Sequence, residues 1–133
     1  VMTESVSDEP FKADGLYIDL YDNTLPVYDG VEVYPGNQRL FINLARVDTS
    51  RPQVLAAASR EYDEVIEADS YSFVAKSPVE TTNVSRVLLP SVPESITVNG
   101  KEVLDIQKWD EKSHTYLLEF ENSPEGVSVR FEW

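Results

Sequence analysis

Cysteine is absent from this chain, and histidine occurs once, as His114. Without cysteine the chain has no disulfide, no thiolate metal ligand and no cysteine nucleophile. A single histidine cannot supply the histidine sets that hold catalytic zinc, and a serine–histidine–aspartate triad would depend on His114 alone. The sequence also has no Gly-x-Ser-x-Gly elbow. We therefore expect a non-catalytic protein with no catalytic residues.

Basic residues are also scarce. The chain has 11 lysines and arginines against 24 aspartates and glutamates, which gives a net charge of −13. Nucleic acids and anionic membrane surfaces attract positively charged proteins, so neither is an expected partner. No run of apolar residues is long enough to cross a bilayer, and we expect no membrane insertion. The acidic surface is typical of a domain that stays dispersed in water.

The sequence does contain many short alternating segments. In the last one, Val127, Val129, Phe131 and Trp133 alternate with polar residues, which is the pattern of a strand with one buried face. Asn99-Gly100 separates two further strand-like segments and predicts a two-residue hairpin turn with positive φ at both positions.

Turn signals recur about every 8–12 residues, a spacing typical of β-sandwiches and barrels. We predict an all-β fold, an antiparallel β-sandwich of about nine or ten short strands. Residues 1–15 are polar and rich in turn formers, and they read as a linker or lead-in segment. Residues 16–133 are expected to form a single β-sandwich domain.

Residues 53–69 leave two interpretations open. Three consecutive alanines and the glutamates and arginine around them favour a helix. The apolar positions do not keep a helical stripe, and the flanking segments are strand-like. The pattern favours two strands with a bend near Ser59-Arg60, with a helix as the alternative.

Three aromatic residues are candidates for binding carbohydrate. Tyr17 and Tyr21 would share a strand face with Asp19, and Trp109 stands beside the acidic residues of a loop. Flat rings stack on the apolar faces of sugars while neighbouring acids and amides bind the hydroxyl groups. The alternative is that these rings are packed in the core or at an interface.

A cluster of oxygen-bearing side chains between residues 19 and 29 suggests calcium as the one cofactor to consider. Asp19, Asp22 and Asp29 are the candidate ligands, with Asn23 beside them. Their spacing does not match an EF-hand loop. The same residues are ordinary turn formers, so the expectation is otherwise for no cofactor and no metal.

The C-terminal part of the chain resembles a known family. A strand ends at Pro90, a hairpin contains Val98-Asn99-Gly100, and Trp109-Asp110 follows. A strand with Leu118 and Phe120 comes next, and Gly126-Val127 with Val129 closes the chain. This order resembles the C-terminal β-sandwich domain of bacterial, Bacteroidetes-type glycoside hydrolases and related polysaccharide-degradation proteins.

The resemblance implies a non-catalytic accessory domain that packs against the catalytic domain of the same parent chain. It also implies a periplasmic, cell-surface or extracellular location. Two alternatives remain: a carbohydrate-binding module with an aromatic platform, whose partner would be an oligosaccharide, and a cell-surface interaction domain.

Overall fold

The computed structural model describes residues 2–4, 9–78 and 80–133, and this part of the chain forms thirteen β-strands and two short 3-10 helices. All strand pairs are antiparallel. The predicted all-β class is therefore confirmed. No helix in the described ranges has the length and apolar character needed to cross a membrane.

The chain divides into two compact units, unit 1 (Val1–Asp48) and unit 2 (Thr49–Trp133). The sequence predicts one domain over 16–133 after a lead-in, but residues 11–15 already belong to a strand of unit 1. The reason is that residues 11–19, 27–33 and 38–43 pair with one another in one sheet, which residues 2–4 also join. Residues 1 and 5–8 of the predicted lead-in lie outside the described residues.

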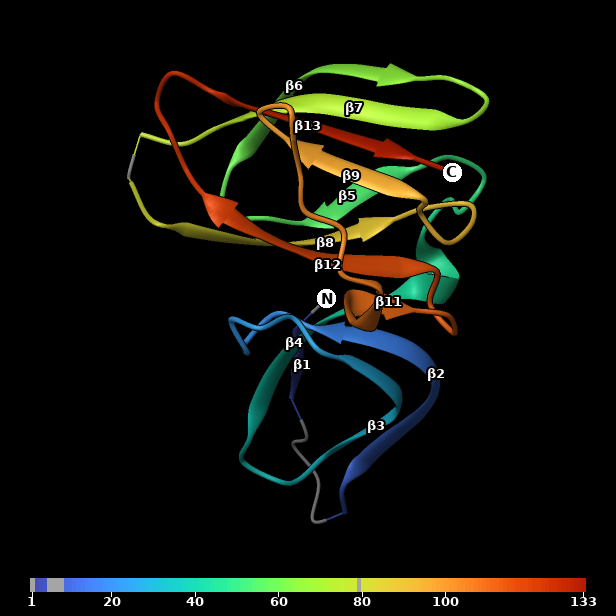
Figure 1. Cartoon of the computed structure of the whole chain (residues 1–133). Helices are drawn as coiled ribbons and strands as arrows, with labels where there is room; N and C mark the ends of the chain where they lie inside the picture. The colour runs from blue at the N-terminus through green and yellow to red at the C-terminus, as the bar shows by residue number, and fades with distance from the viewer. Residues whose placement is uncertain (1, 5–8, 79) are drawn as a thin grey trace. The chain divides into compact units, whose positions relative to one another are not determined.

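Unit 1 is a four-stranded sheet in the order β1-β4-β2-β3, strongly curved in Figure 1. Its elements are β1 (Met2–Glu4), β2 (Phe11–Asp19), β3 (Val27–Val33), β4 (Gln38–Asn43) and the 3-10 helix η1 (Leu44–Arg46). The pairing of β2 with β3 shifts between Ala13 and Leu16, where Gly15 has a φ of 105°. A bulge of this kind bends its strand, in agreement with the observed curvature.

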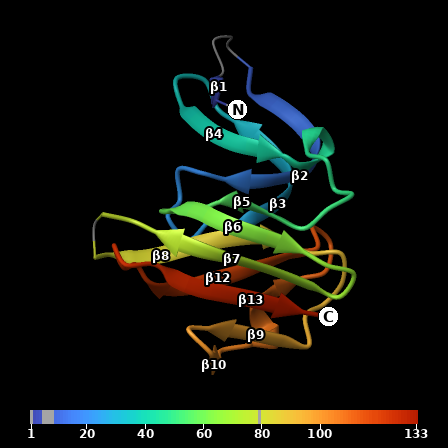
Figure 2. The same cartoon turned by 90° about the horizontal axis from the view of Figure 1, so that it is seen from above.

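Unit 2 contains two sheets, of order β10-β9-β13-β7-β6 and β11-β12-β8-β5. The elements of its first half are β5 (Gln53–Ala56), β6 (Arg60–Ile66), β7 (Ser70–Lys76), β8 (Thr82–Leu88) and β9 (Ser95–Val98). Those of its second half are β10 (Lys101–Glu102), η2 (Ile106–Lys108), β11 (Trp109–Asp110), β12 (Thr115–Glu121) and β13 (Val127–Glu132). Figure 2 shows the strands of the first sheet in this order.

The core of unit 2 lies between these two sheets, which makes the unit a β-sandwich. β13 shows the principle: Val127, Val129 and Phe131 are buried, and the residues between them are exposed, as the alternation predicts. The Phe131 ring stacks on those of Tyr71 and Phe73, each with centroids 6.3 Å apart. These aromatic contacts add to the burial of apolar area.

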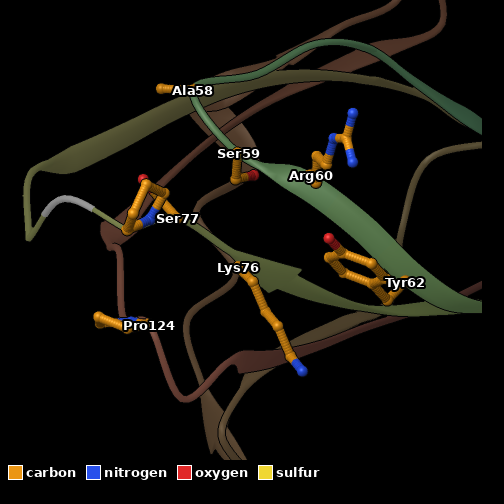
Figure 3. Close-up of a pocket in the computed structure, with 8 residues that line it drawn as sticks. Ala58, Ser59, Arg60, Tyr62, Lys76, Ser77 and Pro124 are labelled. Carbon is orange, nitrogen blue, oxygen red and sulfur yellow. The ribbon is translucent and has the colours of Figure 1, made fainter.

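The structure also settles two local predictions. Residues 53–69 form β5 and β6 with a bend at residues 57–59, close to the predicted position (Figure 3). Pairing of β5 with β8 and of β6 with β7 overrides the helical propensity of the alanines. Asn99 and Gly100 have φ values of 50° and 80°, so the predicted hairpin turn is confirmed.

Candidate functional site

An open depression on unit 1 collects aromatic, charged and amide side chains, and we call it the tyrosine site. Its lining residues come from the end of β2, the loop after it, β3 and β4: Asp19, Tyr21, Asp22, Asn23, Tyr28 and Arg39. Every member is polar or aromatic, which is the composition expected of a surface that binds a polar ligand with flat apolar faces.

Sheet pairing brings these residues together from distant parts of unit 1. Asp19 of β2 lies opposite Phe41 of β4, and Tyr17 lies opposite Tyr28 of β3. Residues directly opposite one another, and residues two apart on one strand, share a sheet face. Arg39 is two residues before Phe41, so it lies on the same face as Asp19 and Tyr28.

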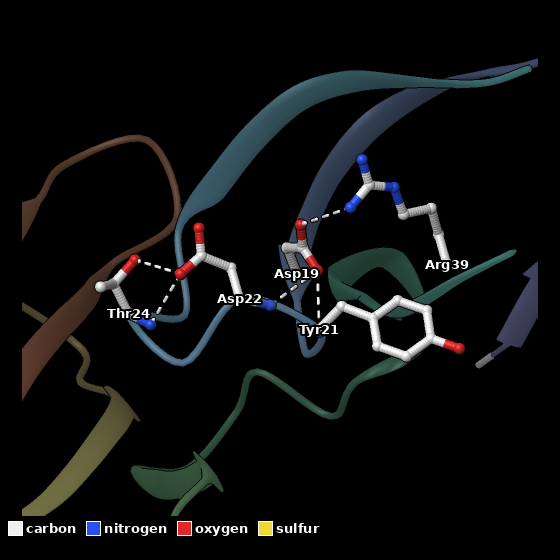
Figure 4. Close-up of polar contacts among 5 residues, drawn as sticks. All are labelled: Asp19, Tyr21, Asp22, Thr24 and Arg39. Atoms are coloured by element: carbon white, nitrogen blue, oxygen red, sulfur yellow. Dashed lines mark hydrogen bonds and ion pairs between the residues drawn. The ribbon is translucent and has the colours of Figure 1, made fainter. Parts of the chain in front are cut away.

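The Asp19 carboxylate shapes the loop that follows β2 (Figure 4). Its Oδ1 accepts hydrogen bonds from the backbone N–H groups of Tyr21 (2.8 Å) and Asp22 (3.3 Å). The Asp19 residue is only 3% exposed. A carboxylate can be buried at this place because backbone donors and a cation satisfy it.

The cation is Arg39, whose Nη1 lies 4.0 Å from Asp19 Oδ2. The two side chains differ in exposure, with 50% of the Arg39 side chain exposed and 4% of that of Asp19. The buried Asp19 carboxylate therefore positions the Arg39 guanidinium by an ion pair. The guanidinium N–H groups that face solvent remain accessible to a ligand. Arginine is well suited to this because its planar fork carries five donors.

A second aspartate closes the loop. Asp22 Oδ1 accepts hydrogen bonds from the backbone N–H of Thr24 (2.9 Å) and from its hydroxyl (2.7 Å), shown in Figure 4. These two bonds from Thr24 lower the pKa of the Asp22 carboxyl below its ordinary value. The tyrosine site therefore keeps this negative charge in moderately acidic solution.

The two tyrosine rings of the site are open to solvent. Tyr21 is 51% exposed and Tyr28 is 41% exposed, while most large aromatic side chains of unit 2 lie in its core. An exposed ring offers an apolar face and a phenolic hydroxyl. Together with the guanidinium of Arg39 and the amide of Asn23, the rings can contact both the C–H faces and the hydroxyl groups of a sugar.

The predicted calcium ligands do not form a metal-binding cluster in the described ranges. No group of three or more histidine, aspartate or glutamate side chains converges there. Asp19 and Asp22 direct their Oδ1 atoms to the backbone of their own loop. Asp29 is an exposed residue of β3, opposite Leu16. The local turn explains the clustering of these acids in the sequence.

The structure places the other two predicted sugar-binding rings in packed surroundings. Tyr17 is half-buried, with its ring edge-on to Phe41 at a centroid distance of 5.8 Å. Trp109 belongs to unit 2, packs against its core cluster and donates from Nε1 to Glu111 Oε2 at 2.6 Å. The centroid of the Trp109 ring lies 5.7 Å from the centroid of the His114 ring.

Tyr28 and Arg39 were not among the predicted site residues. The pattern around Tyr28 indicates one of several surface aromatic residues, so the sequence indicates its exposure but not its place in the site. Arg39 has no local signal, because its place beside Asp19 depends on the register between β2 and β4. Long-range register of this kind cannot be deduced from neighbouring residues.

Comparisons of the chain with protein-family models, with curated proteins and with solved structures found no match. The functional inference therefore depends on the geometry of the described residues.

Proposed function

We propose that this chain is a non-catalytic module of a carbohydrate-processing protein and that unit 1 binds a neutral oligosaccharide at the tyrosine site. One observation carries the proposal: the exposed rings of Tyr21 and Tyr28 line the same depression as Arg39 and Asn23. Aromatic faces and hydrogen-bonding groups on one open surface are what a sugar chain requires.

The charge of the site favours a neutral ligand. Asp22 holds a carboxylate at the surface, and its lowered pKa keeps it ionised. The buried carboxylate of Asp19 lies opposite the single guanidinium of the site, that of Arg39. An anionic sugar would therefore meet more negative than positive charge, whereas neutral hydroxyl groups can both donate to carboxylates and accept from arginine.

Titration calorimetry with a panel of neutral plant and host oligosaccharides tests the proposal. We expect weak, saturable binding that Tyr21→Ala and Tyr28→Ala each reduce about tenfold, since loss of one stacked ring costs about 0.5–1.5 kcal/mol plus its buried area. Tyr34→Ala is the matched control, because Tyr34 is 56% exposed in unit 1 and does not line the site. No binding across the panel, or an equal loss with Tyr34→Ala, would contradict the proposal.

A second candidate function is packing of unit 2 against a neighbouring catalytic domain of the same parent chain. The observation that favours it is β6, which is the last strand of its sheet and exposes Val65 and Ile66 by 47% and 45%. Exposed apolar side chains on an edge strand mark a surface that a partner can cover.

Binding between this chain and a separately produced catalytic domain tests the second candidate. Val65→Ser with Ile66→Ser should weaken the association. Ile106→Ser should not, because Ile106 is an exposed isoleucine (56%) on η2, away from β6. Equal affinities for the two variants would reject β6 as the contact surface.

A further inference from the structure

Unit 2 carries a groove whose lining is positively charged, and we call it the cationic groove. It has a volume of about 470 Å³ and lies beside the start of β6 and the end of β7 (Figure 3). Its lining residues are Ala58, Ser59, Arg60, Tyr62, Lys76, Ser77, Pro78 and Pro124. The described lining contains two cations and no acidic residue, although the chain as a whole has a net charge of −13.

The two cations come from facing backbone positions, and their side chains point in different directions (Figure 3). Arg60 of β6 and Lys76 of β7 are directly opposite one another in the antiparallel pair. Neither side chain takes part in an ion pair within residues 2–4, 9–78 and 80–133. Both cations are therefore available to an anionic ligand.

The lysine is held in place by its surroundings. Its Nζ lies 5.4 Å from the ring centroid of Tyr62, which is the diagonal neighbour of Lys76 across the strand pair. On the other side, Gly126 leaves room for the lysine stem, since a Cβ at this glycine would lie 3.4 Å from Lys76 Cε. The ammonium group is therefore positioned before any ligand arrives, which reduces the entropy lost on binding.

The wall formed by Ala58 and Ser59 is also fixed. Buried Asn83 accepts a hydrogen bond from the Ala58 N–H at 3.2 Å and donates to Ser59 Oγ at 2.8 Å. Asn122 donates to the Ala58 carbonyl at 3.3 Å. This buried network fixes the backbone of the bend that immediately precedes Arg60. Binding residues are most precisely positioned when they lie on such a rigid backbone.

We propose that the cationic groove binds an anionic oligosaccharide, with Arg60 and Lys76 each contacting a carboxylate or sulfate group of the sugar chain. The exposed ring of Tyr62 and the rings of Pro78 and Pro124 provide flat apolar surfaces for the sugar ring. A densely charged polyphosphate does not fit, because the strongly acidic protein around two cations repels it. This site differs from the tyrosine site in its unit and in the charge of its ligand.

Calorimetric titration at low ionic strength tests the inference with three probes of similar length. The probes are an oligogalacturonate (carboxylated), a sparsely sulfated galactan oligosaccharide (sulfated) and a cello-oligosaccharide (neutral). We expect one or both anionic probes to bind, with an affinity that decreases as salt is added. The probe that binds more tightly identifies the anionic group that the groove prefers. The neutral probe should not compete for the groove.

Lys76→Gln and Arg60→Gln should each weaken the anionic probe at least about tenfold, because each removes a charge-assisted contact. Lys101→Gln is the matched control, since Lys101 is an exposed lysine of β10 in the same unit, outside the groove. Thermal unfolding should show that both groove variants are folded, with Lys76→Gln slightly less stable than wild type because it loses the contact with the Tyr62 ring.

Three results would overturn the inference: no binding of either anionic probe, equal weakening by Lys101→Gln, or equally tight binding of a single-stranded oligonucleotide. The outcome is independent of the tyrosine site. Tyr21→Ala should leave the anionic probes unaffected, and Lys76→Gln should leave neutral binding in unit 1 unaffected. Failure of one proposal can therefore be distinguished from failure of the other.

Discussion

Asn83 and Asn122 meet inside unit 2, where Asn83 Nδ2 donates to Asn122 Oδ1 across 3.0 Å. Asn83 also donates to Ser59 and accepts from Ala58 N–H and from the Ser85 hydroxyl. These four bonds use the whole hydrogen-bonding capacity of a fully buried amide. The pair joins β8, the segment after β12 and the bend before β6.

Asn83→Ala should therefore lower the free energy of unfolding of unit 2 by about 2–4 kcal/mol, because it leaves several buried groups without a partner. Urea denaturation followed by tryptophan fluorescence measures this. Thr82→Ala is the control on the same strand: its hydroxyl bonds Glu121 at an exposed site, and the loss should stay under about 1 kcal/mol. A similar loss for both variants would contradict a structural role for the amide pair.

Phe131→Ala should destabilise unit 2 by about 3–5 kcal/mol, since the side chain is fully buried between the two sheets. Ser128→Ala, on the exposed face of the same strand, should change stability by less than about 0.5 kcal/mol. The same denaturation measurement compares them. Comparable effects at the two positions would mean that β13 does not have one buried face.

Two glycines allow the cost of backbone geometry to be separated from that of a steric clash. Both have positive φ, but a Cβ at Gly100 meets nothing within 4 Å, and a Cβ at Gly126 would lie 2.9 Å from Val74 Cγ1. Gly100→Ala should cost about 1–2 kcal/mol from φ alone. Gly126→Ala should cost about 1–3 kcal/mol more because of the clash. The midpoints of thermal unfolding of the two variants measure this difference. A larger loss for Gly100→Ala than for Gly126→Ala would contradict the close packing at Gly126.

Glu102 should contribute to stability in a pH-dependent way. Hydrogen bonds from the Ser95 hydroxyl (2.6 Å) and from the backbone of Ile96 (3.1 Å) lower its pKa below 4.5. A lowered folded-state pKa gives stability that is present above the unfolded pKa and lost as pH falls through the folded pKa. Glu102→Gln should reduce the loss of stability below pH 4.5, measured as urea midpoints against pH. An unchanged pH profile would argue against these bonds.

Glu61 should affect the pH dependence of stability in the opposite direction to Glu102. Burial, and after it the charge of Glu64, raise its pKa above 4.5, so the folded state binds the proton more tightly than the unfolded state. Stability from this group is present below the unfolded pKa and lost as pH rises through the folded pKa. At a pH above the folded-state pKa of Glu61, the Glu61→Gln variant should therefore have a higher free energy of unfolding than wild type. A variant that loses stability there would contradict the prediction.

Local patterns were sufficient for several elements. The alternation of β13 and the turn at Asn99-Gly100 were both predicted correctly. Each depends on residues within a few positions of one another. Side-chain alternation follows from strand geometry, and an asparagine–glycine pair tolerates the positive φ of the turn.

The sites needed information that local patterns do not contain. Alternation predicted the residues that share a strand face with Asp19 but not its burial, which is possible because loop N–H groups and Arg39 satisfy its carboxylate. The Arg60–Lys76 pair likewise follows from the register of β6 with β7. A shift of that register by one residue would move every side chain to the other face.

The sequence by itself determined the all-β class, the hairpin turn and the buried face of the last strand, because these depend on backbone preferences and on a period of two. Tertiary structure alone decided the division into two units, the burial of Asp19 and the composition of the tyrosine site and the cationic groove. Strand register and satisfaction of buried polar groups are set by contacts between distant segments, and no local pattern records them.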